Sequence, residues 1–266
     1  MVLGVDAGST HHKLVWLQGG EVVHQELLST QPCMEESLKR AISRHPQPQV
    51  VIATGYGRHA LVKAGIADGT ITEIKAQTLG VSSLFPQVAT ILDLGGQDFK
   101  VIKVSDGRVL DFEMNDRCAA GTGRFIEMAA NRLALSLEEL DSLAGGCEEG
   151  AKLSSMCAVF AESELVSLMA RGEVVERMAR GVMDSIARRL VAVVKRVGGA
   201  SPFLFTGGGA LLGTLVRRLS DLLGHGVLVP QNPLFTASLG AAIEAEKRLA
   251  RCNESPASAV VNRQTA

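Results

Sequence analysis

The chain has 266 residues, 46% of them hydrophobic, and a mean hydropathy of +0.19, enough for one large domain or two modest ones with a core that needs no disulfides. Lys and Arg total 27, Asp and Glu total 28, and aromatic residues make up 4%, so neither a basic surplus nor a base-stacking platform suggests nucleic-acid binding. Five cysteines, an odd number, argue against a disulfide framework and leave reactive or metal-binding thiols open.

The N-terminal residues begin a strand at once. Residues 1–6 carry neither the cationic stretch nor the long apolar stretch of a secretion signal. No apolar run approaches the roughly 18 residues that cross a bilayer. We therefore expect a soluble, cytoplasmic protein without membrane contacts.

The first 29 residues predict a hairpin followed by a third strand. A short apolar strand ends at Asp6, a tight turn passes through Gly8, and a second strand follows until the Gly19-Gly20 turn. The same pattern recurs at a constant offset of 87 residues. The matched pairs are Asp6 with Asp93, Gly8 with Gly95, Lys13 with Lys100 and Gly20 with Gly107.

A second repeat supports the first. Val51-Ile-Ala-Thr54-Gly55 resembles Leu204-Phe-Thr206-Gly207 at an offset of 152, and each predicts a strand, a Gly-rich turn and a helix. The two offsets differ by 65 residues, so the second half carries an insertion, mostly helical. We predict a duplicated α/β core with two halves around a cleft: residues 1–90, residues 91–250 with an insertion at about 112–198, and a flexible tail at 251–266.

Opposed Gly-rich turns suit a nucleotide triphosphate, because their N–H groups bind phosphate oxygens while carboxylates hold Mg²⁺. Asp6 and Asp93 are the candidate magnesium residues, and Gln97 and Asp98 are candidates for orienting water or acting as a base. The remaining candidate nucleotide-binding residues are Gly8, Ser9, Thr10, Lys13, Gly95, Gly96, Gly121, Thr206, Gly207 and Gly208. The alternative is that the glycines only turn hairpins and Lys13 covers a solvated face. Neither the Walker pattern nor the Rossmann fingerprint occurs.

Two of the five cysteines stand out. Cys118 and Cys157 each precede a helical apolar stripe, the second including Phe160, so both are expected at helix N-termini that favour the thiolate, a ligand for soft iron. Cys33, Cys147 and Cys252 lack this setting and read as small buried residues. Zinc stays possible, although the chain has no Cys-x-x-Cys spacing.

Four segments together resemble a known family. They are Asp6-Ala-Gly-Ser-Thr, Thr54-Gly-Tyr-Gly-Arg58, Asp93-Leu-Gly-Gly-Gln-Asp98 and Phe205-Thr-Gly-Gly208. They resemble the acetate and sugar kinase/Hsp70/actin superfamily. The segments around Cys118 and Cys157 narrow the resemblance to its activase branch, the ATP-dependent activators of 2-hydroxyacyl-CoA dehydratases and the ATPase subunits of benzoyl-CoA reductase. The resemblance implies an actin-like (ribonuclease H-like) ATPase core that binds ATP and Mg²⁺.

The same resemblance implies the redox chemistry. Cys118 and Cys157 of two subunits would share one [4Fe–4S] cluster in an anaerobic homodimer. A ferredoxin or flavodoxin would supply the electron, and a 2-hydroxyacyl-CoA dehydratase or a reductase would receive it. ATP hydrolysis would move the cluster-bearing helices, with the segment between the Asp93 turn and Cys118 as the coupling element.

Two positions depart from the family pattern. His12 stands where threonine is usual and is expected to weaken a phosphate contact or to point outward, and Gln77 stands where histidine is frequent and is expected to keep a hydrogen bond. We still expect ATPase activity. The alternative function is a small-molecule kinase of the same superfamily that phosphorylates a sugar or a carboxylic acid. Finally, apolar residues at i+4 steps predict a long core helix over residues 174–197.

Overall fold

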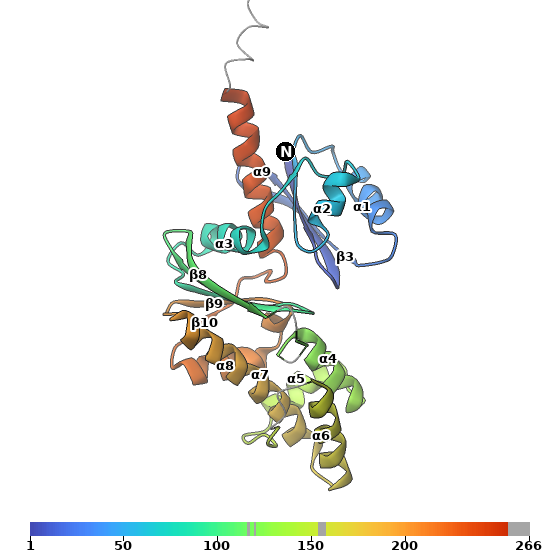
Figure 1. Ribbon diagram of the computed structural model, residues 1–266, viewed down its shortest axis with the longest axis vertical. Coiled ribbons are helices and arrows are strands. Elements are labelled where there is room, and N and C mark those ends of the chain that lie inside the picture. Colours follow the sequence, from blue (N-terminus) through green and yellow to red (C-terminus); the bar gives the residue numbers. More distant parts are fainter. Residues whose placement is uncertain (116–117, 120, 154–157, 255–266) are drawn as a thin grey trace, which may run out of the picture. The chain divides into compact units, whose positions relative to one another are not determined.

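The computed structural model describes residues 1–115, 118–119, 121–153 and 158–254. The chain divides into two compact units, one made of Met1–Ser83 with the chain from Phe235 onward, the other of Leu84–Leu234. Each unit contains one five-stranded sheet with helices against it (Figure 1).

The first unit is built on a mixed sheet in the order β3-β2-β1-β4-β5. The antiparallel strands β1 to β3 come from the first predicted hairpin, and β4 and β5 add in parallel on the other side of β1. The strands are β1 (Val2–Ala7), β2 (His11–Gln18), β3 (Glu21–Ser29), β4 (Val51–Thr54) and β5 (Gly69–Thr70).

Both faces of this sheet are covered by helices. Leu3, Leu14 and Trp16 pack on one face with α1 (Met34–Ser43), and α2 (Arg58–Lys63) contacts β4. Val2 and Val15 pack on the opposite face with α9 (Thr236–Glu254). The helix α3 (Glu73–Leu84) completes the unit.

Three glycines bring α9 into this unit. A Cβ on Gly4 would collide with the backbone at Ser238 and Ala242, so β1 and α9 approach to backbone contact. Gly80 of α3 and Gly240 of α9 make the same kind of approach to each other's helix. The division therefore differs from the expected 91–250 half, because α9 packs on the first sheet although it follows the second in sequence.

The second unit repeats the first sheet. Its order is β10-β9-β6-β7-β8, with β6 to β8 antiparallel and β9 and β10 parallel, which matches the first unit strand for strand. The strands are β6 (Thr90–Leu94), β7 (Phe99–Ser105), β8 (Arg108–Asn115), β9 (Phe203–Gly207) and β10 (Val227–Leu228). The matching order confirms the predicted duplicated α/β core.

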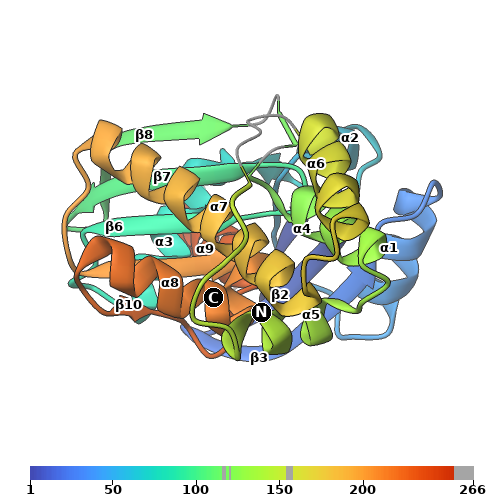
Figure 2. The same cartoon turned by 90° about the horizontal axis from the view of Figure 1, so that it is seen from below.

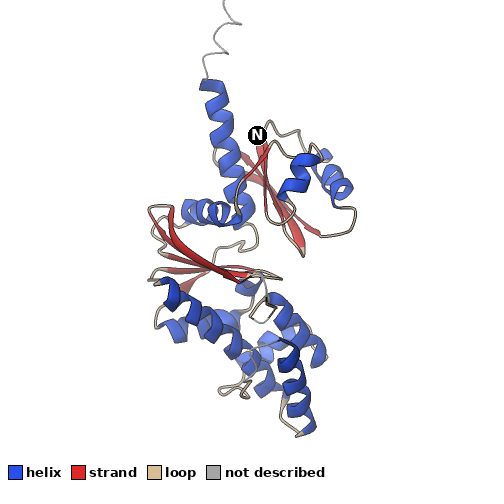
Figure 3. Ribbon diagram, viewed as in Figure 1, coloured by secondary structure: helices blue, strands red, loops and turns tan. Residues whose placement is uncertain are grey.

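The extra residues of the second unit are helical, as predicted (Figure 3). The long helix α7 runs against the sheet beside α8 (Figure 2). Of its predicted core residues, Met178, Val182, Ile186, Leu190 and Val194 are buried. The prediction is wrong for Val174, which is the N-cap and is 53% exposed. The helices are α4 (Gly123–Arg132), α5 (Leu137–Gly145), α6 (Ala158–Ala170), α7 (Val175–Val197), the 3₁₀ helix η1 (Gly208–Leu211) and α8 (Gly213–Leu223).

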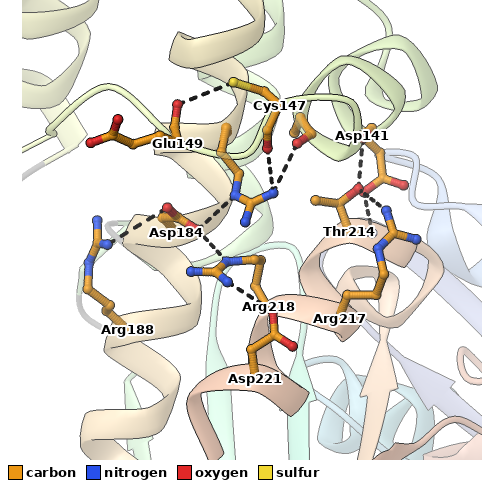
Figure 4. Close-up of polar contacts among 11 residues, drawn as sticks. Asp141, Cys147, Glu149, Asp184, Arg188, Thr214, Arg217, Arg218 and Asp221 are labelled. Atoms are coloured by element: carbon orange, nitrogen blue, oxygen red, sulfur yellow. Dashed lines mark hydrogen bonds and ion pairs between the residues drawn. The ribbon is translucent and has the colours of Figure 1, made fainter.

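A buried carboxylate joins these helices (Figure 4). Asp184 of α7 accepts hydrogen bonds from Nε of Arg180, at 3.2 Å, and from Nε of Arg218 on α8, at 2.6 Å. Arg180 also donates to the carbonyl oxygen of Cys147 at 2.7 Å, beyond the end of α5. Charged hydrogen bonds therefore connect the helices of this unit in addition to their apolar packing.

The C-terminal end differs from its prediction. The helix α9 continues to Glu254, so residues 251–254 are helical where a tail from 251 was expected, and residues 255–266 lie outside the described part of the chain. Among the described residues, no helix is long and apolar enough to span a membrane.

Candidate functional site

The turn after β1 places Asp6 against Lys13. The two residues are cross-strand partners in the register of β1 and β2, and Nζ of Lys13 donates to Oδ2 of Asp6 at 3.0 Å. Asp6 is 6% exposed, and the Lys13 side chain is 19% exposed. Lys13 is therefore held at the turn, which contradicts the alternative of a lysine on a solvated face.

Three polar atoms around this turn are buried without a hydrogen-bond partner among the described residues. They are Oδ1 of Asp6, Oγ1 of Thr10 and Oγ1 of Thr54. Thr54 pairs with Asp6 in the register of β1 and β4. Such atoms usually have a partner, so the turn has the chemistry to receive a hydrated cation or a phosphate.

Glycine leaves space beside the unpartnered oxygen of Asp6. Gly55 follows Thr54 with φ of +80°, and a Cβ there would lie 2.5 Å from Oδ1 of Asp6. A Cβ on Gly8 would lie 2.7 Å from the carbonyl oxygen of His11. Any larger residue at 55 would therefore occupy the space beside the unpartnered oxygen.

The second unit repeats the arrangement with one more partner. Asp93 and Lys100 are cross-strand partners, with Nζ of Lys100 at 3.3 Å from Oδ2 of Asp93 and 2.9 Å from Oδ1 of Asp98. Oγ1 of Thr206 donates to Oδ1 of Asp93 at 3.0 Å. Both oxygens of Asp93 are thus engaged, whereas Asp6 keeps one oxygen for a ligand.

Lys100 is a functional candidate that the offset of 87 residues pairs with Lys13 but to which the sequence pattern assigns no role. It is 1% exposed and lies between two carboxylates, one of which, Asp98, is a predicted catalytic residue. The signal was present in the offset of 87, which aligns it with Lys13. Gln97, in contrast, is exposed, so its amide is free to meet a ligand or a water molecule.

The same turn holds the start of α4. The N–H of Gly123 donates to the carbonyl oxygen of Gly95 at 2.9 Å, and the N–H of Arg124 donates to that of Gly96 at 2.8 Å. A Cβ on Gly123 would lie 2.9 Å from the Gly95 oxygen, so this approach requires glycine. Two predicted nucleotide-binding residues therefore also satisfy the free N–H groups at a helix N-terminus.

The other predicted glycines differ in their surroundings. Gly207 has φ of +78°, and a Cβ there would lie 2.8 Å from Oδ1 of Asp93. Gly208 is exposed, and a Cβ there would meet nothing within 4 Å. Gly121 is buried against Phe99 and Arg189 with φ of +84°. Of these three, Gly208 has open space beside it.

The cysteines are placed differently from their predictions. Cys118 is exposed and precedes Thr122, the N-cap of α4, by four residues, so the expected helix-start position is wrong for Cys118. Cys157 lies outside the described residues. Cys33 is exposed, Cys252 is exposed on α9, and Cys147 is partly exposed, so the expected burial of these three is also wrong. Cys33 is the N-cap of α1, so the expectation that it lacks a helix-start position is wrong as well.

The apolar stripe of α6 is divided between core and surface. Ala161 and Leu165 are buried, as predicted, but Phe160 is 68% exposed and is not part of the core. Val159 is also 68% exposed, and Val166 and Met169 are each 44% exposed. We call Val159, Phe160, Val166 and Met169 the apolar surface of α6.

The two departures from the family pattern are both buried. His12 is 1% exposed, so the alternative that it points outward is wrong, and neither ring nitrogen has a hydrogen-bond partner among the described residues. Burial lowers the pKa of His12, and the nearby Asp6 carboxylate only partly offsets this. Gln77 accepts a hydrogen bond at 3.0 Å from Oγ1 of Thr236, so this side chain keeps a polar contact.

The sequence is similar to known proteins along most of its length. The family model described as the BadF/BadG/BcrA/BcrD ATPase family matches residues 3–245. The chain is 36% identical to the (R)-2-hydroxyglutaryl-CoA dehydratase activating ATPase of Acidaminococcus fermentans, over 94% of this chain and 98% of that protein. It is 38% identical to the 2-hydroxyisocaproyl-CoA dehydratase activator of Clostridioides difficile, over 91% of this chain and 94% of that protein.

A solved structure is similar over nearly the whole chain. The activator of the 2-hydroxyisocaproyl-CoA dehydratase from Clostridium difficile, with bound ADPNP, superposes with a TM-score of 0.88 at 34% identity, covering 95% of this chain and 97% of that one. This similarity confirms the predicted actin-like ATPase core.

Proposed function

We propose, because the chain belongs to the BadF/BadG/BcrA/BcrD ATPase family, that it hydrolyses ATP to activate a 2-hydroxyacyl-CoA dehydratase or a related reductase. The similar activators cover almost the full length of this chain, which favours an activator over a small-molecule kinase. The observation that carries the proposal is the hydrogen-bonded contact between the Gly95-Gly96 turn and the start of α4, five residues after Cys118 in the sequence.

Each of the two Asp-Gly turns carries groups that would bind part of a nucleotide. Asp6 offers a buried, unpartnered oxygen to Mg²⁺ or to its water, and Lys13 holds the other oxygen of that carboxylate. Ser9, Thr10 and the N–H groups near Gly8 would bind phosphate oxygens. Thr206, Gly207 and Gly208 would pass close to the nucleoside, where Gly208 leaves room.

Hydrolysis needs a positioned water molecule. Gln97 is exposed on the turn after β6 and can orient water with its amide. Asp98 is held against Lys100 by an ion pair, which fixes the position of its carboxylate in the turn. We therefore propose that Gln97 orients the water molecule and that Asp98 stabilises the turn through its ion pair with Lys100.

The coupling element would be the turn and α4 together. When the γ-phosphate leaves, a shift of the Gly95-Gly96 backbone moves the carbonyl groups that hold Gly123 and Arg124. The start of α4 follows, and with it the segment of Cys118. This route is short because both ends belong to the same unit.

Cys118 is an exposed free thiol, which suits a ligand that reaches a shared site. Cys118 and Cys157 of two subunits would hold one [4Fe–4S] cluster, which supplies one-electron transfer from a ferredoxin or flavodoxin to the dehydratase or reductase. The apolar surface of α6 supports the homodimer, because its exposed apolar side chains begin two residues after Cys157 in the sequence. Such chemistry belongs in an anaerobic cytoplasm.

The test is iron and sulfide analysis of the anaerobically purified chain. We expect a brown protein with four irons per two chains, and loss of iron without loss of ATP binding in Cys118→Ser. Cys252→Ser is the matched control, because Cys252 is an exposed cysteine of α9 that the proposal does not use.

The same samples test the function directly. With a ferredoxin, ATP and a dehydratase component, the control should activate the dehydratase and Cys118→Ser should not. A colourless, iron-free dimer after anaerobic reconstitution would overturn the redox proposal. Phosphoryl transfer from ATP to a sugar or carboxylic acid would establish the kinase alternative instead.

A further inference from the structure

A second cluster of ligating side chains lies in the first unit. His24 and Glu26 are two residues apart on the edge strand β3, so they share one face of the sheet. His45 follows α1, directly after its C-cap residue Arg44. One ligand atom from each of the three residues lies within 4.8 Å of the other two.

The two imidazole rings are held in place by Trp16. The ring centroids of His24 and His45 are 4.0 Å apart, and that of Trp16 lies 5.2 Å from His24 and 4.5 Å from His45. Trp16 is buried and pairs with His24 across β2 and β3. A fixed wall behind both rings limits their rotation, which pre-organises their nitrogens.

Glu26 presents one free oxygen to this cluster. Oε1 of Glu26 forms an ion pair with Nη2 of Arg44 at 3.2 Å. Oε2 is buried, lies 3.6 Å from Nε2 of His45 and has no hydrogen-bond partner among the described residues. A separation of 3.6 Å exceeds a hydrogen bond. This is an unsatisfied acceptor beside two imidazoles.

We propose that His24, Glu26 and His45 bind a zinc ion, with water as the fourth ligand. Two imidazoles and one carboxylate are a ligand set that zinc uses, whereas magnesium and calcium prefer oxygen ligands alone. Ligands at about 2.0–2.2 Å from zinc lie closer to each other than 4.8 Å, so the partly buried Glu26 and His45 side chains move closer together on binding. Arg44 would remain on Oε1 and fix the carboxylate.

The site is separate from the predicted nucleotide turn of the same unit. His24 and Glu26 pair with Trp16 and Leu14, whose side chains pack on the α1 face of the sheet. Lys13 is adjacent to Leu14 and therefore points to the opposite face, where it meets Asp6. Zinc would join β3 to the end of α1, and we expect ATP affinity to stay unchanged.

The test is equilibrium dialysis of the anaerobically purified, cluster-loaded protein against zinc, with zinc and iron measured in each sample. We expect one zinc per chain without loss of iron, and at least a tenfold loss of zinc affinity in both His45→Ala and Glu26→Gln. His59→Ala is the control, because His59 is an exposed histidine of α2 in the same unit. Glu26→Gln preserves shape if His45→Ala fails to fold.

Two further readouts complete the design. Zinc should raise the unfolding temperature of the wild-type chain and of His59→Ala but not that of Glu26→Gln. Cobalt(II) in the same site should give a visible spectrum without a thiolate band. Equal zinc affinity in Glu26→Gln and wild type, or zinc uptake that displaces iron, would overturn the proposal and leave an ion pair between His45 and Glu26.

Discussion

At the scale of single residues, the two halves differ most in their buried charges. Asp6 has one basic partner and one buried oxygen without a hydrogen-bond partner among the described residues, whereas Asp93 and Asp98 share the fully buried Lys100. An ammonium group with so little solvent is stable only because two carboxylates surround it. Removing its charge leaves those carboxylates buried without compensation.

Lys100→Met should therefore destabilise the second unit by about 3–5 kcal/mol at neutral pH. Lys103→Met is the control, because Lys103 lies on the same strand and is only partly buried. Denaturant unfolding, followed by circular dichroism, measures both. Equal stability of the two variants would show that Lys100 is not the charge that holds the turn together.

His12 predicts a pH dependence. Burial lowers its folded pKa below the unfolded value, so between these two values the unfolded chain binds more protons. The free energy of unfolding therefore falls as the pH drops below about 6.5. His12→Gln should flatten this part of the profile, and His59→Gln, an exposed control, should retain it. An unchanged slope in His12→Gln would assign the pH dependence to another group.

At the scale of elements, the contact between the Gly95-Gly96 turn and α4 is the feature that joins the two predicted chemistries. It depends on Gly123, where a Cβ would lie 2.9 Å from a carbonyl oxygen and 3.0 Å from Cα of Gly96. A methyl group there separates the turn from the helix by a few tenths of an ångström. The turn itself, between β6 and β7, is left intact.

Gly123→Ala should lower ATP-dependent activation of the dehydratase by about tenfold, while the KM for ATP changes little. Gly146→Ala is the control, since a Cβ at Gly146 meets its nearest atom at 3.7 Å and φ is ordinary. Measuring both dehydratase activation and the ATPase rate of each variant separates an effect on coupling from an effect on the nucleotide site. Parallel loss of both activities would mean that the contact shapes the nucleotide site rather than the coupling.

The elements also show what sequence could and could not predict. The hairpins, the helix from 175 to 197 and the matching strand orders follow from repeats and periodicity, which are local signals. The position of Cys118 was missed because Thr122, not the cysteine, is the N-cap of α4, and N-cap positions depend on backbone geometry. Phe160 was missed because an apolar stripe does not reveal whether a surface is covered.

The candidate site was predictable in part. Asp6 and Lys13 pair as their spacing across a hairpin requires, and the offset carried the pair to Asp93 and Lys100. The ion pair between Asp98 and Lys100 was not predictable, because it depends on the conformation of the turn between β6 and β7. The histidine and glutamate cluster at β3 and α1 was missed because its members join only through tertiary contact.

At the scale of the whole molecule, the proposed homodimer makes the apolar surface of α6 an interface. Phe160→Asp places a charge in that surface and should weaken dimerisation by about 30-fold or more. Val62→Asp is the control, because Val62 is 40% exposed on α2 in the other unit. Sedimentation at several concentrations measures the association, and iron content should fall with it in Phe160→Asp alone. A Phe160→Asp protein that dimerises like Val62→Asp would place the interface elsewhere.

The place of α9 has a consequence for how the chain is made. The first unit leaves its sheet uncovered on one face until the residues from 236 onward are available, because Gly4 and its neighbours pack against that helix. During synthesis on the ribosome, residues 84–234 emerge complete before the first 83 have their last partner. The unit that begins the chain is therefore the last to close, and nascent chains stopped before residue 236 would expose an apolar sheet to chaperones.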